Sequence, residues 1–350
     1  MKLAKPSSKH LLWPDLIRIV AMAGVVVIHA FKLPNYDLPL VFPFSVLSLV
    51  GFVIAKTCVP LFLMLSGSLL LDKVEPDRVF LFKRLRRILI PWLIWTGIFL
   101  VTKYLPNLTS LTAGLKTFRQ IFTAEFSFLP VLFCLYLLIP YLKTLVRNTS
   151  YLKQVVLVGL WFLGVSLLPY LRDSMAFPAV VDNGLVRQTI NYSGYLILGW
   201  LIQLATTKYL ALQGYWQWIM MLGWLTVGAT SFLYITHPES PQRYLSYVAP
   251  MIILTSVISF YLLILLGKTL QKKIYTQKIL SSVVAKLSFA SFGVFFSHPL
   301  IILGLETFIF KNVRPATVEH NLAMSGLAII GSFGLVMLLN KIKFLGKLVS

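Results

Sequence analysis

Apolar segments long enough to cross a lipid bilayer recur along nearly the whole chain, from Leu16 to Leu339, with only short polar interruptions. A transmembrane helix needs roughly 17 to 25 predominantly apolar residues. About ten segments meet this requirement: Leu16–Leu33, Leu47–Leu71, Ile88–Leu105, Phe126–Leu145, Val155–Leu171, Ile190–Ala205, Trp216–Ile235, Leu245–Leu266, Leu287–Phe310 and Leu322–Leu339. Of the 350 residues, 58% are hydrophobic and 12% are charged, which is more apolar surface than a soluble fold can bury. The pattern predicts an all-α, polytopic membrane protein with about ten transmembrane helices around a central cleft, in one domain over residues 1–350 with no soluble second domain.

The formal net charge of +21 would suggest a nucleic-acid partner in a soluble protein, but here the cations lie in the loops between predicted spans. Basic loops orient a membrane protein and contact anionic lipid head groups, so we expect membrane lipids and not nucleic acid as partners; a phosphate-bearing ligand is the alternative. Of the 32 lysines and arginines, 21 fall in one set of loops and nine in the opposite set, alternating strictly through the ten spans. Because cytoplasmic loops are the more basic ones, this predicts both termini in the cytoplasm.

The first predicted span contains two ionisable residues. Placing such a side chain at the middle of a membrane costs about 2.5 kcal/mol or more, so each is expected to have a structural or functional role. Arg18 and His29 are eleven positions apart, so on a helix they differ by only about 20° in direction and lie about 16 Å apart along the axis. Asp15, three residues before Arg18, can pair with it. The three residues predict one groove, with Arg18 at the cytoplasmic interface and His29 deeper, toward the outer leaflet. A snorkelling arginine and a histidine hydrogen-bonded to a neighbouring helix are the alternative.

A basic stretch, Lys83–Trp92 (KRLRRILIPW), places four cations just before the third predicted span. Arginine binds phosphate oxygens bidentately. Arg84, Arg86 and Arg87 are therefore a candidate phosphate clamp on the cytoplasmic side. An ordinary basic loop that only sets the orientation of the protein is the alternative.

Four further polar residues lie in or at the ends of predicted spans. Ser66 belongs to a Ser-Gly-Ser step that predicts either close helix packing or a hydroxyl that faces a pore. His298 precedes Pro299, which removes a helix N–H donor and leaves backbone groups open to polar partners. Glu306 lies two turns beyond His298 on a similar face, and Glu125 marks the outward end of the fourth span.

Taken in order, these features resemble acyltransferase family three, whose multi-span members acylate surface polysaccharides and related acceptors. The resemblance covers most of the chain. The motifs are Asp-x-x-Arg-x-x-Ala and Arg-x10-His in the first helix, Pro-x-Phe-x-x-x-Ser-Gly in the second, Arg-x-x-Arg before the third, and Ser-Phe-Gly with His-Pro in the ninth. The matching residues are Asp15, Arg18, Ala21 and His29; Pro60, Phe62, Ser66 and Gly67; Arg84 and Arg87; and Ser291, Gly293, His298 and Pro299. In the fourth span, many relatives have His-Leu-Trp-Phe-Leu where this chain has Glu-Phe-Ser-Phe-Leu, so we expect Glu125 to replace the histidine as the polar group.

The resemblance implies a membrane acyltransferase that moves an acyl group, acetyl in particular, from cytosolic acyl-CoA to a hydroxyl of a cell-surface or lipid-linked glycan. Acetyl-CoA is then the expected donor, with its phosphates on Arg84, Arg86 and Arg87, and no metal is expected. His29 is expected to act as the general base, in a catalytic group with Arg18 and Asp15. The candidate substrate or pore residues are Ser66, Glu125, Ser291, His298 and Glu306.

The expected location is the plasma (inner) membrane of a bacterium, as a multi-pass protein. A transporter or flippase without acyl transfer is the main alternative function, because intramembrane arginine and histidine also mark substrate paths. The sequence leaves open the acceptor glycan, the acyl chain length and the oligomeric state. It also leaves open the choice between direct transfer and an acyl-enzyme intermediate on His29 or Ser66.

Overall fold

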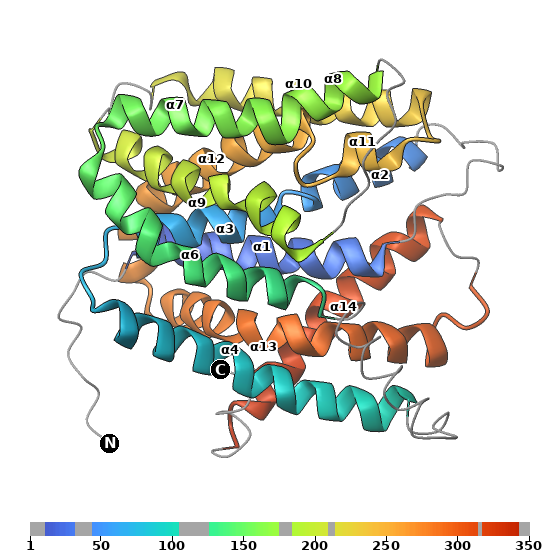
Figure 1. Ribbon diagram of the computed structural model, residues 1–350. Coiled ribbons are helices and arrows are strands. Elements are labelled where there is room, and N and C mark those ends of the chain that lie inside the picture. The colour runs from blue at the N-terminus through green and yellow to red at the C-terminus, as the bar shows by residue number, and fades with distance from the viewer. Residues whose placement is uncertain are drawn as a thin grey trace.

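The computed structural model describes residues 11–31, 44–104, 126–174, 184–208, 214–313 and 317–342, and within these ranges every regular element is a helix. Most helices run in a similar direction and form a bundle (Figure 1). They are α1 (Leu12–Ala30), α2 (Phe44–Ala55), α3 (Cys58–Leu70), α4 (Asp77–Phe99), α6 (Phe128–Asn148), α7 (Tyr151–Phe162), α8 (Leu168–Ser174), α9 (Leu185–Lys208), α10 (Trp216–Thr236), α11 (Pro241–Leu245), α12 (Pro250–Thr276), α13 (Lys278–Phe308) and α14 (Val318–Leu339). A π-helical turn at Leu100–Tyr104 extends α4, and a second at Leu163–Leu167 joins α7 to α8.

Nine helical stretches within the described ranges are long and apolar enough to cross a membrane, which confirms the prediction of an all-α, polytopic membrane protein. The second predicted span forms two helices, α2 and α3, with a break at Lys56 and Thr57. The sixth predicted span falls within α9, which is 24 residues long and is not one of those nine stretches. Two of its polar residues, Gln188 and Tyr192, line the internal cavity of the bundle.

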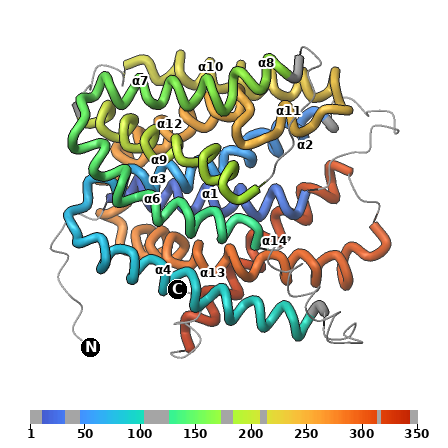
Figure 2. The backbone as a smooth tube through the Cα atoms, viewed as in Figure 1, coloured from blue at the N-terminus to red at the C-terminus, as the bar shows by residue number. Residues whose placement is uncertain are grey.

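Helix α1 lies inside the bundle and contacts α2, α3, α12, α13 and α14. Its Ile17, Ala21 and Val26 are completely buried. Figure 2 traces α1 through the middle of the bundle, with α7 and α10 on one side and α4 on the other. The outer helix α7, in contrast, exposes apolar side chains such as Val156 and Leu160, as lipid-facing helices do. The fold therefore buries Asp15, leaves Arg18 half-buried and His29 exposed where they line the cavity, and turns apolar surface outward.

Glycines allow α3 and α9 to pack with their backbones in contact. A Cβ atom at Gly67 would overlap the backbone of Leu196, and one at Gly199 would overlap the backbone of Met64. Small residues permit this close approach of membrane helices. The Ser-Gly-Ser step of the second predicted span thus serves helix packing through Gly67, and this packing fixes α9 against α3 beside the cavity.

Several helices begin earlier than predicted, and the difference is largest for α4 and α13. Helix α4 starts at Asp77 and not at Ile88, and α13 starts at Lys278 and not at Leu287. Hydropathy detects only the apolar part of a helix, whereas lysine and arginine are themselves good helix formers. The prediction that the basic stretch is a segment preceding the third helix was wrong: Arg84, Arg86 and Arg87 lie on α4 itself.

Candidate active site

A cavity of about 970 Å³ opens between α1, α3, α4, α6, α9 and α13. Helix α1 contributes a continuous stripe to its wall, formed by Asp15, Arg18, Met22, Val25 and His29. Their spacing of three or four residues keeps them on one face of the helix. The predicted groove that contains both Arg18 and His29 is thus present, with apolar side chains between them.

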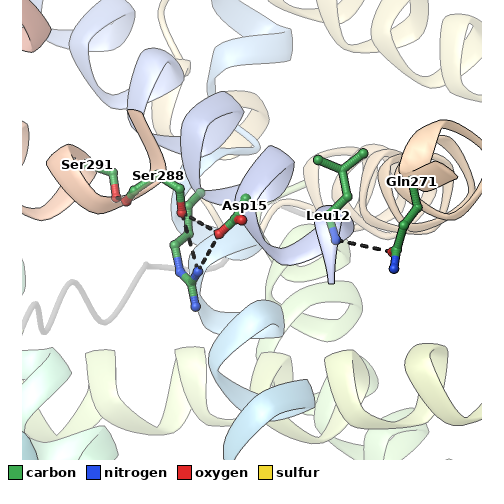
Figure 3. A network of polar contacts seen from close by, with 6 residues as sticks. Leu12, Asp15, Gln271, Ser288 and Ser291 are labelled. Atoms are coloured by element: carbon green, nitrogen blue, oxygen red, sulfur yellow. Dashed lines mark hydrogen bonds and ion pairs between the residues drawn. The ribbon is translucent and has the colours of Figure 1, made fainter. Parts of the chain in front are cut away.

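Figure 3 shows a polar network that includes Asp15 and Ser288. This network holds Arg18 in the cavity wall. Arg18 Nη1 lies 3.0 Å from Asp15 Oδ1, which confirms the predicted pairing. The hydroxyl of Ser288 on α13 donates to the same carboxylate oxygen at 2.6 Å and accepts from Arg18 at 3.4 Å. Ser291 donates to the carbonyl oxygen of Ser288 at 2.7 Å, and Gln271 on α12 accepts from the backbone N–H of Leu12 at the start of α1. Groups on α1 and α13 therefore fix the position of the arginine, and α12 holds the start of α1.

The cationic part of the cavity is formed by Arg18 together with Lys73, Arg84 and Arg87. Arg84 and Arg87 are three positions apart and share a face of α4, whereas Arg86 lies on another face and does not line the cavity. Both lining arginines rest on aromatic rings, with Cζ 5.8 Å from the ring centre of Phe80 and of Phe292, respectively.

The loop between α3 and α4 adds one carboxylate to this basic region. Glu75 lies 2.7 Å from Lys83 Nζ and 3.4 Å from Lys73 Nζ. The hydrogen bond from Lys83 is the main reason why the pKa of Glu75 is lowered from its ordinary value. Glu75 is therefore an anion at neutral pH, and it partly neutralises the lysine that lines the cavity.

His29 lines the same cavity beyond Met22 and Val25. Its Nδ1 lies 2.8 Å from the carbonyl oxygen of Val25. Because a carbonyl oxygen can only accept, Nδ1 carries the proton, and in the neutral imidazole Nε2 then carries the lone pair. This is the tautomer that can take a proton from a hydroxyl.

The other predicted site residues have different positions. Ser66 and Ser291 both line the cavity. His298 is buried behind the wall, and neither it nor Glu306 lines the cavity. Glu125 lies outside the described residues.

Sequence reasoning missed several lining residues. Ser288, Gln188, Tyr192 and Tyr247 all belong to the wall. The only sequence signal for two of them is the polarity of α9 within an otherwise apolar chain. The contribution of Ser288 depends on the packing of α13 against α1, which no local pattern indicates.

The fold and this cavity define a class of protein: a polytopic helical membrane protein whose interior joins a cluster of cations to an imidazole along one helix. The family model of acyltransferase family three, which describes an acyltransferase domain, matches residues 11–341, and the chain belongs to this family. No curated protein and no solved structure matches the chain. Membership makes the protein an acyltransferase and decides against a transporter or flippase without acyl transfer.

Proposed function

We propose that the protein transfers an acetyl group from cytosolic acetyl-CoA to a hydroxyl of a cell-surface or lipid-linked glycan, in the plasma (inner) membrane of a bacterium. One observation carries this proposal: a single cavity contains Arg18, Arg84, Arg87 and His29. The eleven residues from Arg18 to His29 correspond to about 16 Å of helix, so a donor that reaches from one to the other must be long and must carry its anionic groups at one end.

Acetyl-CoA has this chemistry. Its phosphates fit the guanidinium groups of Arg84 and Arg87, because arginine pairs with phosphate through parallel, charge-assisted hydrogen bonds. Its pantetheine arm is long and flexible and fits the apolar wall at Met22 and Val25. The thioester would then lie beside His29.

The acceptor hydroxyl meets the thioester at His29. As the hydroxyl oxygen attacks the thioester carbonyl, Nε2 of His29 takes the hydroxyl proton. The carbon–sulfur bond then breaks, and the proton passes from His29 to the thiolate, which leaves as the CoA thiol. A route through an acyl-enzyme on His29 or Ser66 would instead leave an acetyl adduct on that residue, which mass spectrometry of the quenched protein detects.

Mass spectrometry of surface glycans tests the proposal. Cells that lack the protein are compared with cells that express the wild type or His29→Ala, with membrane levels of the two proteins matched by immunoblot. We expect an acetyl increment on the glycan only with the wild type. A glycan whose mass is the same with and without the wild-type protein would refute a glycan acceptor, and an increment retained in His29→Ala would remove His29 as the base.

A further inference from the structure

A second imidazole stands directly behind His29. The ring centres of His29 and His298 are 4.9 Å apart, with an angle of 63° between the ring planes. The side chain of His298 is only 3% exposed and does not line the cavity, so a substrate in the cavity would not touch it. Any effect of His298 on the reaction must therefore pass through His29.

A hydrogen bond of His298 fixes its tautomer. Its Nδ1 lies 3.0 Å from the carbonyl oxygen of Val294. Nδ1 is thus the donor, and the neutral ring carries its lone pair on Nε2. That nitrogen is buried and has no hydrogen-bond partner among the described residues.

A buried acceptor without a partner needs an explanation. In the resting state both imidazoles present a lone pair on Nε2, and two lone pairs cannot hydrogen-bond to one another. Once His29 has taken a proton, the lone pair of His298 has a positive charge to stabilise. The interaction is therefore absent in the ground state and present in the transition state, which is the kind of interaction that accelerates a reaction.

His29 is the ionisable side chain nearest to His298, with 4.9 Å between the two ring centres. The other ionisable side chains on the elements around this part of α13 lie further along their helices. They include Glu306, Lys278 and Lys286 on α13, Asp15 and Arg18 on α1, Asp77, Arg78, Lys83, Arg84, Arg86 and Arg87 on α4, Lys268, Lys272 and Lys273 on α12, and Glu319 and His320 at the start of α14.

We propose that His298 is a positioning residue for acyl transfer: the lone pair on its Nε2 stabilises the proton that His29 takes from the acceptor hydroxyl. This inference rests on the proposed function, in which His29 is the base. The proton balance is unchanged, since the proton still leaves on the CoA thiol. His298 stays neutral in the resting enzyme and lowers the barrier only while His29 is protonated.

Kinetics of two variants test the inference. His298→Phe keeps a ring in the core without an acceptor, and we expect kcat to fall about 10- to 100-fold, the value of a hydrogen bond to a charged group. The KM for acetyl-CoA should stay within about twofold, because His298 does not line the cavity. His298→Gln can place an amide oxygen near the position of Nε2, and we expect it to recover most of the lost kcat. Wild-type kcat in the Phe variant, or equal losses in folded Phe and Gln variants, would overturn the proposal.

A second measurement needs no turnover and so separates this inference from the proposed function. Diethyl pyrocarbonate labels unprotonated imidazoles, and peptide mass spectrometry reads the labelling of His29 separately from the other four histidines. If His298 stabilises the proton on His29, the pH of half-maximal labelling should fall by about one unit in His298→Phe and stay near wild type in His298→Gln. Identical labelling profiles in all three proteins would refute the interaction even if the wild type acetylates a glycan. The predicted shift in a protein that fails to acetylate any glycan would refute only the proposed function.

Discussion

Replacing the two arginines of α4 that line the cavity should selectively weaken binding of the donor. A hydrogen bond to a charged group contributes about 1.5 to 3 kcal/mol, and the lower value applies here because both arginines are partly exposed. Loss of about 1.5 kcal/mol raises KM about tenfold, so Arg84→Gln and Arg87→Gln should each raise the KM for acetyl-CoA by about that factor. In the double variant the KM for acetyl-CoA should rise between 10- and 100-fold, because the effects of neighbouring residues that share one ligand are not additive.

The assay measures initial rates in nanodiscs against acetyl-CoA concentration, at a saturating concentration of acceptor. Arg86→Gln is the matched control: it removes the same charge from the same helix but outside the cavity, and its KM should stay within about twofold of wild type. A short acetyl thioester without a nucleotide gives a second control, because it has no phosphate to lose. Two results would refute the phosphate clamp. One is an equal rise in KM for acetyl-CoA in Arg86→Gln and Arg87→Gln. The other is a rise in KM for the short thioester in Arg84→Gln or Arg87→Gln as large as the rise for acetyl-CoA.

Three further changes have distinct expected outcomes. Ser288→Ala removes the hydroxyl that joins the α1 ion pair to α13, and it should raise the KM for acetyl-CoA about tenfold. Ser291→Ala loses a bond only to its own helix and should raise this KM less. A larger KM in Ser291→Ala than in Ser288→Ala would contradict the role of the network. Glu75→Gln removes an anion from the basic region and should lower the KM for acetyl-CoA about twofold. Because the pKa of Glu75 is lowered, its carboxylate is ionised throughout pH 6 to 8, and the effect on KM should be constant over this range. An effect on KM that varies with pH in this range would contradict the prediction. Gly67→Ala should lower the free energy of unfolding in detergent by about 1 to 3 kcal/mol, because the added methyl group overlaps α9. Gly97→Ala has open space around it and should not lower this free energy. Equal melting temperatures of the two variants would argue against the close contact between α3 and α9.

Local periodicity predicted the central part of the site. The positions of Asp15, Arg18 and His29 on one face follow from the pitch of a single helix, which needs no knowledge of its neighbours. The same rule places Arg84 and Arg87 together and turns Arg86 about 200° away from Arg84, so the sequence already contained the signal that separates Arg86 from its neighbours. Grouping all three cations as one clamp ignored that periodicity.

The rest of the site depends on which helices pack together. Ser288 completes the ion pair only because α13 lies against α1, and His298 adjoins His29 for the same reason. Tyr192 joins the wall because Gly67 brings α9 onto α3. Such contacts link residues that are far apart in the chain, and hydropathy, which locates spans one at a time, does not pair them.

The most direct test of a donor path from the cations of α4 to His29 is a structure determined with a non-hydrolysable acetyl-CoA analogue bound. We predict that the phosphates contact Arg84 and Arg87 and that the acyl carbon lies beside His29, with the pantetheine arm along Met22 and Val25. A nucleotide bound outside this cavity, or an acyl end directed away from His29, would contradict that path.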